Sequence, residues 1–415
     1  MYFCKMINWL DDLPDKQALL DWHRRSTPLT VHEVNAHLHT PYSFSAFHNM
    51  EQLFDKAQEE NVKVLGINDF YTTDGFEPFH KQSLAYRIFP LFNIEFMGLL
   101  KTEQEQGIRV NDPNNPGRVY FCGKGLDFPV SKDSPSQEKI MKLSRESHFQ
   151  VKEMTIKADN ILKEADPDLR LDFEDIQKRY TKGMVRERHI ARAIRTMIFE
   201  KYATVDQRKS MLKTLFGGKN PLANMNNHAE LEDEIRSVLL KAGGAAFVKE
   251  DPKAFITIDE VISIILDAGG IPCYPALLDA KPGEFTGFEE DWDVLYRKLQ
   301  KRHISCIELI PIRNDFDVVK RFVNYFQEKN FIITFGTEHN SPALTPLRVD
   351  TRGDVPFDYE LRKTAYEGAC VIAAHQYLRS KGEEGFVSTS GIPKLDQKDR
   401  FIELGAAVID RFIQR

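Results

Sequence analysis

Short β-forming runs alternate with amphipathic helical stretches along most of this 415-residue chain, and this alternation limits its fold more than any other feature. It predicts parallel strands joined by crossover helices. The predicted strands are residues 31–38, 62–68, 89–96, 118–122, 270–274, 305–310 and 331–336, and the predicted helices between them are 50–60, 77–87, 292–302 and 316–329.

Seven such strands are enough to close a barrel. We therefore expect an α/β fold, a distorted seven-stranded (β/α)7 TIM-like barrel with a helical insertion. An open doubly wound sheet is the alternative, although the sequence contains no Gly-rich phosphate-binding fingerprint.

The alternation is interrupted at residues 131–249, where apolar residues recur at helical spacing among many charges. This pattern predicts a helical insertion that arches over the barrel mouth as a lid. The expected division is an N-terminal helical extension (1–30) ending at Pro28, a barrel (31–130 and 250–345), the insertion (131–249), and two C-terminal helices packing on the barrel (346–415).

Composition excludes several classes of protein. With 56 basic and 62 acidic residues the net charge is −6, which is not the electrostatic footprint of a nucleic-acid coat, so we do not expect a nucleic-acid partner. No apolar run approaches the length of a membrane span, and the N-terminus does not resemble a signal peptide. Five irregularly spaced cysteines argue against a disulfide framework. We expect a cytoplasmic protein of undetermined oligomeric state.

Metal-binding residue types stand where the predicted strands end. In a β/α barrel the active site lies at the carboxyl ends of the strands. His37 and His39 end the first strand, and their i, i+2 spacing puts both rings on one face. The other strand ends carry Asp69, Glu95 and the pair Glu338-His339. Such a mixed nitrogen and oxygen set suits Zn, Mn or Fe.

Several segments, in order, resemble the PHP (polymerase and histidinol phosphatase) family. The segments are His37-Leu38-His39-Thr40 with Ser43, Gly66-Ile67-Asn68-Asp69 with Gly75, Phe92-Asn93-Ile94-Glu95, Arg188-His189-Ile190-Ala191-Arg192, Ala268-Gly269-Gly270-Ile271-Pro272, Cys306-Ile307-Glu308 and Gly336-Thr337-Glu338-His339-Asn340. The resemblance implies a distorted seven-stranded barrel with two or three metals that hydrolyses phosphoesters.

The chain departs from the family pattern at ligand positions. Aromatic or amide residues replace ligands at Phe44, Phe70, Tyr120, Tyr274 and Asn340. The resemblance still implies one metal site, built from His37, His39, Glu95 and Glu338. A second ion would use Glu95 and His189, and His339 stands one residue out of register. We therefore expect one or two divalent ions (Mn, Zn or Fe) and not three.

The resemblance also implies roles for other residues. Asp69 would orient a ligand or a water, His189 would be a ligand or a general acid, and Arg192 would lie near a phosphate. Substrate-binding candidates are Arg188, Tyr120, Tyr274 and Asn340. Arg188, Arg192 and Arg195 share one helix face, which either receives an anionic substrate or pairs with the acidic segments 172–175 and 230–234.

The function expected from this resemblance is hydrolysis of a small phosphorylated metabolite or nucleotide by metal-activated hydroxide. Two alternatives stay open, because fold does not fix function. One is a metal-dependent isomerase, lyase or non-phosphate hydrolase on the same barrel. The other is a degenerate, non-catalytic binding protein in which Phe44, Phe70 and Tyr274 fill the former site.

Overall fold

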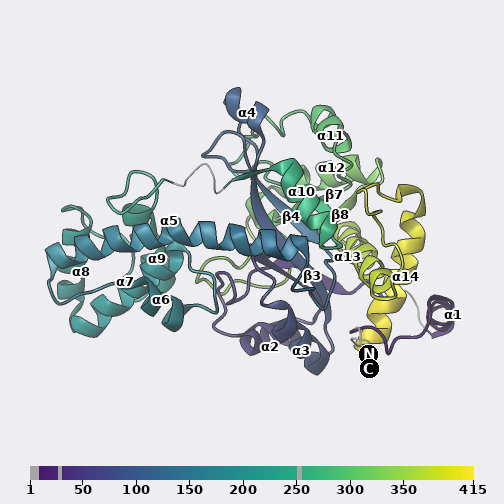
Figure 1. Ribbon diagram of the computed structural model, residues 1–415, viewed down its shortest axis with the longest axis horizontal. Coiled ribbons are helices and arrows are strands. Elements are labelled where there is room, and N and C mark those ends of the chain that lie inside the picture. The colour runs from purple at the N-terminus through teal and green to yellow at the C-terminus, as the bar shows by residue number, and fades with distance from the viewer. Residues whose placement is uncertain (1–8, 27–29, 250–254) are drawn as a thin grey trace.

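A computed structural model, which describes residues 9–26, 30–249 and 255–415, confirms the seven-stranded barrel (Figure 1). Its strands are hydrogen-bonded in the order β1-β2-β3-β4-β6-β7-β8. The parallel bridge Leu38↔Glu338 and the bond from His39 N to Glu338 O (2.8 Å) bring β8 back to β1, so the barrel is nearly closed. The strands are β1 (Glu33–Leu38), β2 (Val62–Phe70), β3 (Phe89–Leu99), β4 (Arg118–Lys124), β6 (Ile271–Ala276), β7 (Cys306–Leu309) and β8 (Ile332–Phe335).

The expectation of uniformly parallel strands is wrong for β4. This strand pairs antiparallel with both β3 and β6. The segment between β3 and β4 contains only the five-residue helix α4 (Lys101–Glu105), which is too short for the crossover that a parallel strand needs. The two-residue strand β5 (Ile256–Thr257) pairs parallel with β3 outside the barrel order.

Amphipathic helices link the barrel strands and share its apolar core. The N-cap of α2, Asn49, accepts a hydrogen bond from Gln52 N (2.8 Å), and α10 begins at a capping box between Thr257 and Glu260. These helices are α2 (Met50–Glu59), α3 (Phe76–Tyr86), α10 (Ile258–Asp267), α11 (Trp292–Gln300) and α12 (Phe316–Gln327).

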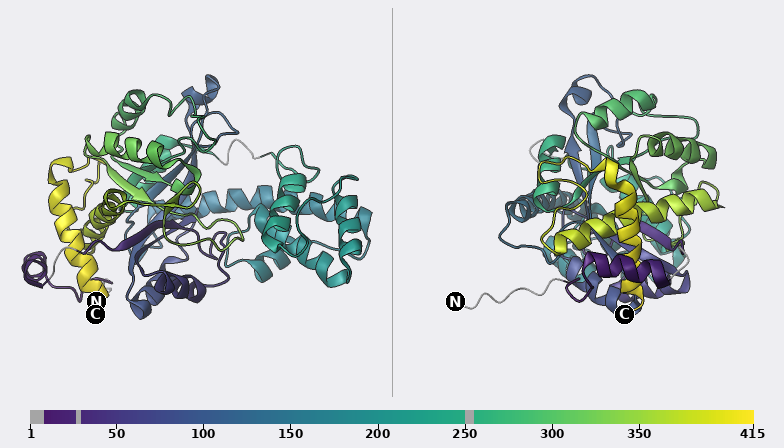
Figure 2. Two further views of the ribbon diagram at one scale, coloured as in Figure 1. Left: turned by 180° about the vertical axis from the view of Figure 1, so that it is seen from behind. Right: turned by 90° about the vertical axis from the view of Figure 1, so that its right-hand side faces the viewer.

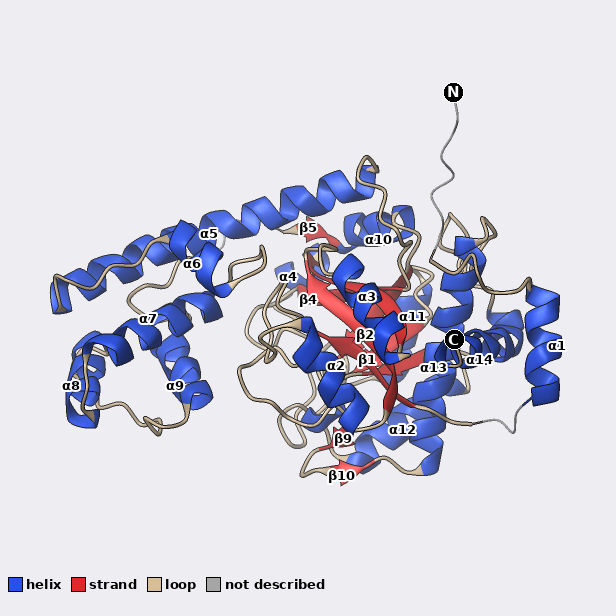
Figure 3. Cartoon of the chain, turned by 90° about the horizontal axis from the view of Figure 1, so that it is seen from below, coloured by secondary structure: helices blue, strands red, loops and turns tan. Residues whose placement is uncertain are grey.

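The segment between β4 and β5 is helical and has a separate apolar core, which runs from Val151 to Val248. Its elements are α5 (Pro135–Ala165), α6 (Phe173–Tyr180), α7 (Glu187–Lys201), α8 (Val205–Leu215), α9 (His228–Ile235) and a π-helical turn (Arg236–Leu240). The long helix α5 starts against the barrel and carries the other helices out to one side of it (Figures 1 and 3). The predicted arch over the mouth is therefore limited to a short contact, described below.

Two C-terminal helices, α13 (Tyr359–Ser380) and α14 (Lys398–Ile413), cross each other against the barrel, and α1 (Lys16–Ser26) lies beside α14 (Figure 2). Nearly all of α13 is buried. A Cβ at Gly368 would overlap the carbonyl of Ile333, and one at Gly405 would overlap that of Cys370, so glycine permits both close approaches.

The predicted helix end at Pro28 falls outside the described residues. No helix in the described part of the chain is long and apolar enough to cross a membrane.

Candidate metal centre

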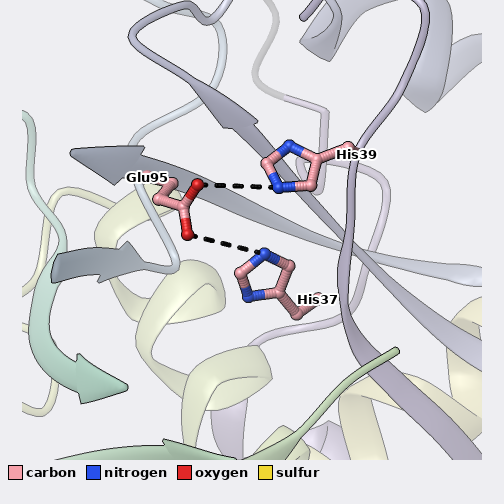
Figure 4. Close-up of side chains that lie close together, drawn as sticks. All are labelled: His37, His39 and Glu95. Atoms are coloured by element: carbon pink, nitrogen blue, oxygen red, sulfur yellow. Dashed lines mark ion pairs between the residues drawn. The ribbon is translucent and has the colours of Figure 1, made fainter. Parts of the chain in front are cut away.

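Two histidines from the carboxyl end of β1 and a glutamate from within β3 converge inside the barrel. His37 and His39 lie on the inner face of β1, and their Nε2 atoms are 4.0 Å and 3.6 Å from the two carboxylate oxygens of Glu95 on β3 (Figure 4). All three side chains are buried, and one ligand atom from each lies within 4.8 Å of the others. The site therefore offers two nitrogen ligands and one oxygen ligand.

Hydrogen bonds fix which nitrogen of His39 faces Glu95. Ser43 Oγ donates to Asp69 Oδ1 (2.7 Å), so this hydroxyl can only accept from His39 Nδ1, 3.2 Å away. His39 thus carries its proton on Nδ1, and its Nε2 lone pair faces Glu95. The carboxylate of Asp69 also accepts from Thr40 N (2.7 Å) and Thr40 Oγ1 (2.5 Å). Asp69 consequently holds the loop after β1 and, through Ser43, orients His39.

The ring of His37 is held from the opposite side. Its Nδ1 lies 2.7 Å from Glu308 Oε2 on β7, which leaves Nε2 toward Glu95. Glu308 in turn accepts from Lys124 Nζ on β4 (2.5 Å) and from Thr334 Oγ1 (3.2 Å). Glu308 and Lys124 are completely buried, and their mutual attraction sets the charge state: the pKa of Glu308 is lowered to about 2, against burial, and the pKa of Lys124 is raised.

The electrostatics of the three converging groups suit a cation. Burial and the neighbouring carboxylates Glu338 and Glu308 raise the pKa of Glu95 well above its usual range. Burial, the adjacent ring of His37 and the positive charges of Arg188, Lys124 and Arg186 lower the pKa of His39 well below its usual range. A neutral imidazole is the form that binds metal, and a bound cation would favour an ionised Glu95. The donor set therefore fits a divalent ion of the Mn, Zn or Fe type.

Glu338 and His339, the acidic and histidine candidates after β8, are turned to other partners. Both have positive φ, 60° and 51°. The Glu338 carboxylate forms an ion pair with Arg313 and accepts from Asn340 Nδ2 (2.6 Å). His339 stacks on Phe47 and bonds through Nε2 to the carbonyl of Thr345 (2.9 Å). Neither belongs to the clusters of mutually close ligand atoms found among the described residues.

His189 lies buried in the first turn of α7. Its Nδ1 accepts the backbone N–H of Arg186 (2.9 Å), so only Nε2 remains for a ligand or a proton. Burial, followed by the charge of Arg192, lowers the pKa of His189 to about 3. The ring is therefore neutral near pH 7, which suits a ligand better than a general acid. Among the described residues, His189 does not join the group formed by His37, His39 and Glu95.

The arginine face of α7 pairs with the second of the two acidic segments considered from the sequence. Arg188 Nη1 donates to Asp233 Oδ1 (3.0 Å) on α9. Arg192 and Arg195 share the carboxylate of Glu232, at 3.4 Å and 2.8 Å. These ion pairs hold α7 to α9. Of the two interpretations of this helix face, the one in which it pairs with an acidic segment agrees with the structure.

The insertion reaches the barrel mouth through residues 182–186. Lys182 N and Met184 N donate to the carbonyls of Pro41 and Tyr42 in the loop after β1 (3.2 Å and 3.4 Å). The guanidinium of Arg186 lies 4.7 Å from the ring centre of Phe70, and Phe44 stacks on His39 with ring centres 4.4 Å apart. Phe44 therefore covers His39, and Phe70 lies next to Phe44 (ring centres 6.3 Å apart), at positions where the resemblance implied ligands.

The two candidate tyrosines face opposite sides of the sheet. Tyr120 lies two residues before Cys122 on β4, so it shares the interior face, and burial, followed by the charges of Asp112 and Glu95, raises its pKa. Tyr274 on β6 points outward and donates from its hydroxyl to Glu289 Oε1 (2.5 Å). Expected contact with substrate at Tyr274 is not supported, because strand alternation directs its ring away from the barrel interior.

Sequence reasoning missed Lys124, Asn68 and Glu308 as site residues. Each is a fully buried polar or charged residue on a barrel strand, at the parity that faces the interior. That parity was a usable signal for burial, since a lone charge in a buried strand needs a partner. Which partner it takes is not visible in the strand itself.

Comparisons with known proteins bear on the family and the fold of the chain. The sequence profile of the PHP domain matches residues 35–244, just over half of the chain. A crystal structure from Bifidobacterium adolescentis, provisionally assigned as a metal-dependent phosphoesterase, is similar in fold: TM-score 0.53, 15% identity, covering 83% of this chain and 97% of that one. An amidohydrolase structure from Chromobacterium violaceum, with sulfate bound and no metal, has a TM-score of 0.49 and 16% identity, covering 80% and 96%. No curated protein sequence matches significantly.

Proposed function

The chain belongs to the PHP domain family, and from that premise we propose that it is a metal-dependent phosphoesterase acting on a small phosphorylated metabolite or nucleotide. The observation that carries this proposal is the convergence of His37, His39 and Glu95, with both histidines presenting Nε2 to the carboxylate. These three residues would hold one ion. A second would need Glu95 and His189, so we expect one or two ions of Mn, Zn or Fe, in a cytoplasmic protein.

A divalent ion bound there supplies Lewis acidity and activates water near neutral pH. The protein's own contribution is orientation and charge. Asp69 fixes His39 through Ser43, and Glu308 fixes His37. Positive charge from Arg188, Lys124 and Arg186 reaches His39, and the same field favours a phosphate at the mouth. The hydroxyl of Tyr120, on the interior face, is a candidate for a hydrogen bond to substrate.

Phosphate release from a panel of phosphomonoesters, with Mn, Zn or Fe added to chelator-treated protein, tests this function. We expect turnover that requires metal and falls by at least about 100-fold in His37→Ala. His48→Ala is the matched control, because His48 is exposed in the loop after the same strand and should leave turnover unchanged. Turnover of phosphate-free sugars or acids instead would favour the isomerase or lyase alternative.

Elemental analysis of protein purified without chelator tests the metal count. One or two ions per chain agree with the proposal, and three would refute it. No bound metal in carefully prepared wild-type protein would favour a non-catalytic binding protein.

A further inference from the structure

The ammonium group of Lys124 lies deep inside the barrel, behind His37. Lys124 is completely buried, and its Nζ has three oxygen acceptors: Glu308 Oε1 (2.5 Å), Asn68 Oδ1 (3.1 Å) and the carbonyl of Ala36 (3.4 Å). An ammonium has three N–H donors, so each donor has one acceptor. The function proposed above uses this cation only as part of the positive field at the mouth and assigns it no role in orienting His37.

Two of these three acceptors also touch the ring of His37. Glu308 uses its other oxygen, Oε2, to accept from His37 Nδ1 (2.7 Å). Asn68 directs its amide nitrogen to the ring, 3.2 Å from Nδ1 and 3.1 Å from Nε2. The bond from Lys124 to Asn68 Oδ1 decides which end of that amide faces the ring. One side chain therefore orients both neighbours of His37.

We propose that Lys124 is a positioning residue: a permanent internal cation that keeps His37 in its Nδ1–H tautomer, with Nε2 presented to Glu95. Glu308 must accept at Oε2 for that tautomer to persist, and Lys124 holds Glu308 by its Oε1. Outer-shell partners of this kind typically change metal affinity by about 10–100-fold when they are removed.

This assignment rests on the proposed function only for its consequence in metal binding. The tautomer exists in metal-free protein and can be measured there. The two ideas can therefore fail separately.

Nitrogen-15 NMR of histidine-labelled, metal-free protein reports the tautomer directly, with the His37 signal assigned by its loss in His37→Ala. We expect wild-type protein to show the Nδ1–H form at His37 and Lys124→Met to show a mixture or the Nε2–H form. Lys398→Met is the matched control, because Lys398 is partly buried and donates to the carbonyl of Phe331 (2.7 Å), away from His37. It should leave the His37 signal unchanged.

Lys124→Met leaves Glu308 buried without its cation, so a second variant guards against a loss of folding. Lys124→Met/Glu308→Gln removes both charges, while the amide oxygen of Gln can still accept from His37 Nδ1. We expect this double variant to fold and to recover the Nδ1–H form partly. Titration with Mn²⁺ or Zn²⁺ should give affinities about 10–100-fold weaker in Lys124→Met than in wild type.

Three results bear on the assignment in different ways. An unchanged tautomer and affinity in folded Lys124→Met would overturn it and leave Lys124 as a structural ion pair. An Nε2–H form of His37 in wild-type protein would overturn it as well. A tautomer change in Lys124→Met, with no metal bound by wild type at millimolar concentration, would support the assignment and overturn the proposed function.

Discussion

Gly336 lies where β8 passes against His37, and replacing it with alanine should displace the metal centre. An ideal Cβ at 336 would lie 2.8 Å from both Cα and the backbone nitrogen of His37, and closer still to its Cβ. Carbon atoms in good contact are separated by about 3.5–4.0 Å. The segment at Gly336 and the strand that carries His37 must therefore separate by roughly 1 Å.

His37 cannot move away to relieve this overlap. Its ring is anchored at 2.7 Å on the buried Glu308, and the backbone N–H groups of Thr337 and Glu338 both donate to the carbonyl of His37 (3.3 Å and 3.0 Å). Overpacking of this kind costs about 1–3 kcal/mol, occasionally more. At about 2–4 °C per kcal/mol, a cost near 3 kcal/mol lowers Tm by about 6–12 °C. A 1 Å error in ligand placement can reduce turnover by about 100-fold.

Thermal unfolding and metal titration of Gly336→Ala measure both effects. Gly287→Ala is the matched control, since its Cβ would have only Ile108 Cγ2 nearby, at an ordinary 3.8 Å. The control should change Tm by less than about 2 °C. If Gly336→Ala kept wild-type Tm and wild-type metal affinity, the close seating of β8 on His37 would be refuted.

Three further predictions concern other parts of the structure. Burial raises the pKa of Glu289 from 4.5 to about 7, so between pH 4.5 and 7 only the folded state holds this proton. The free energy of unfolding should therefore fall by about 3 kcal/mol as pH rises from 4.5 to 7. Urea titrations of Glu289→Gln should not show this dependence on pH. Arg192→Ala should lower the free energy of unfolding by about 1 kcal/mol, because Arg192 loses its pairing with Glu232, and KM should not change. A rise in KM of more than about 10-fold would show that Arg192 reaches substrate. Chelation should lower Tm, because a ligand at 100 times its Kd stabilises by about 2.7 kcal/mol; calorimetry of Glu95→Gln should show no such loss.

Local patterns were enough to predict most of the fold and the centre of the site. The strand and helix periods placed all seven barrel strands within a few residues of their observed bounds. The i, i+2 spacing of His37 and His39 put both rings on one face, because alternation along a strand is a local property. Glu95 followed from its place at the end of the predicted strand 89–96, since the carboxyl ends of parallel strands meet at one rim, although β3 itself runs on to Leu99.

Contacts between residues far apart in the sequence decided the rest of the site. Lys124 and Glu308 are 184 residues apart, Arg188 and Asp233 are 45 apart, and nothing along the strand or helix itself selects one partner over another. The side chains of Glu338 and His339 bind Arg313 and the carbonyl of Thr345, and among the described residues neither joins the cluster of His37, His39 and Glu95. The register of β6 in the closed barrel directed Tyr274 outward. The sequence determined which residues stand at the barrel mouth, and the closed tertiary structure determined which of them meet, because a buried charge or lone pair is satisfied only by a group that the fold brings within hydrogen-bond distance.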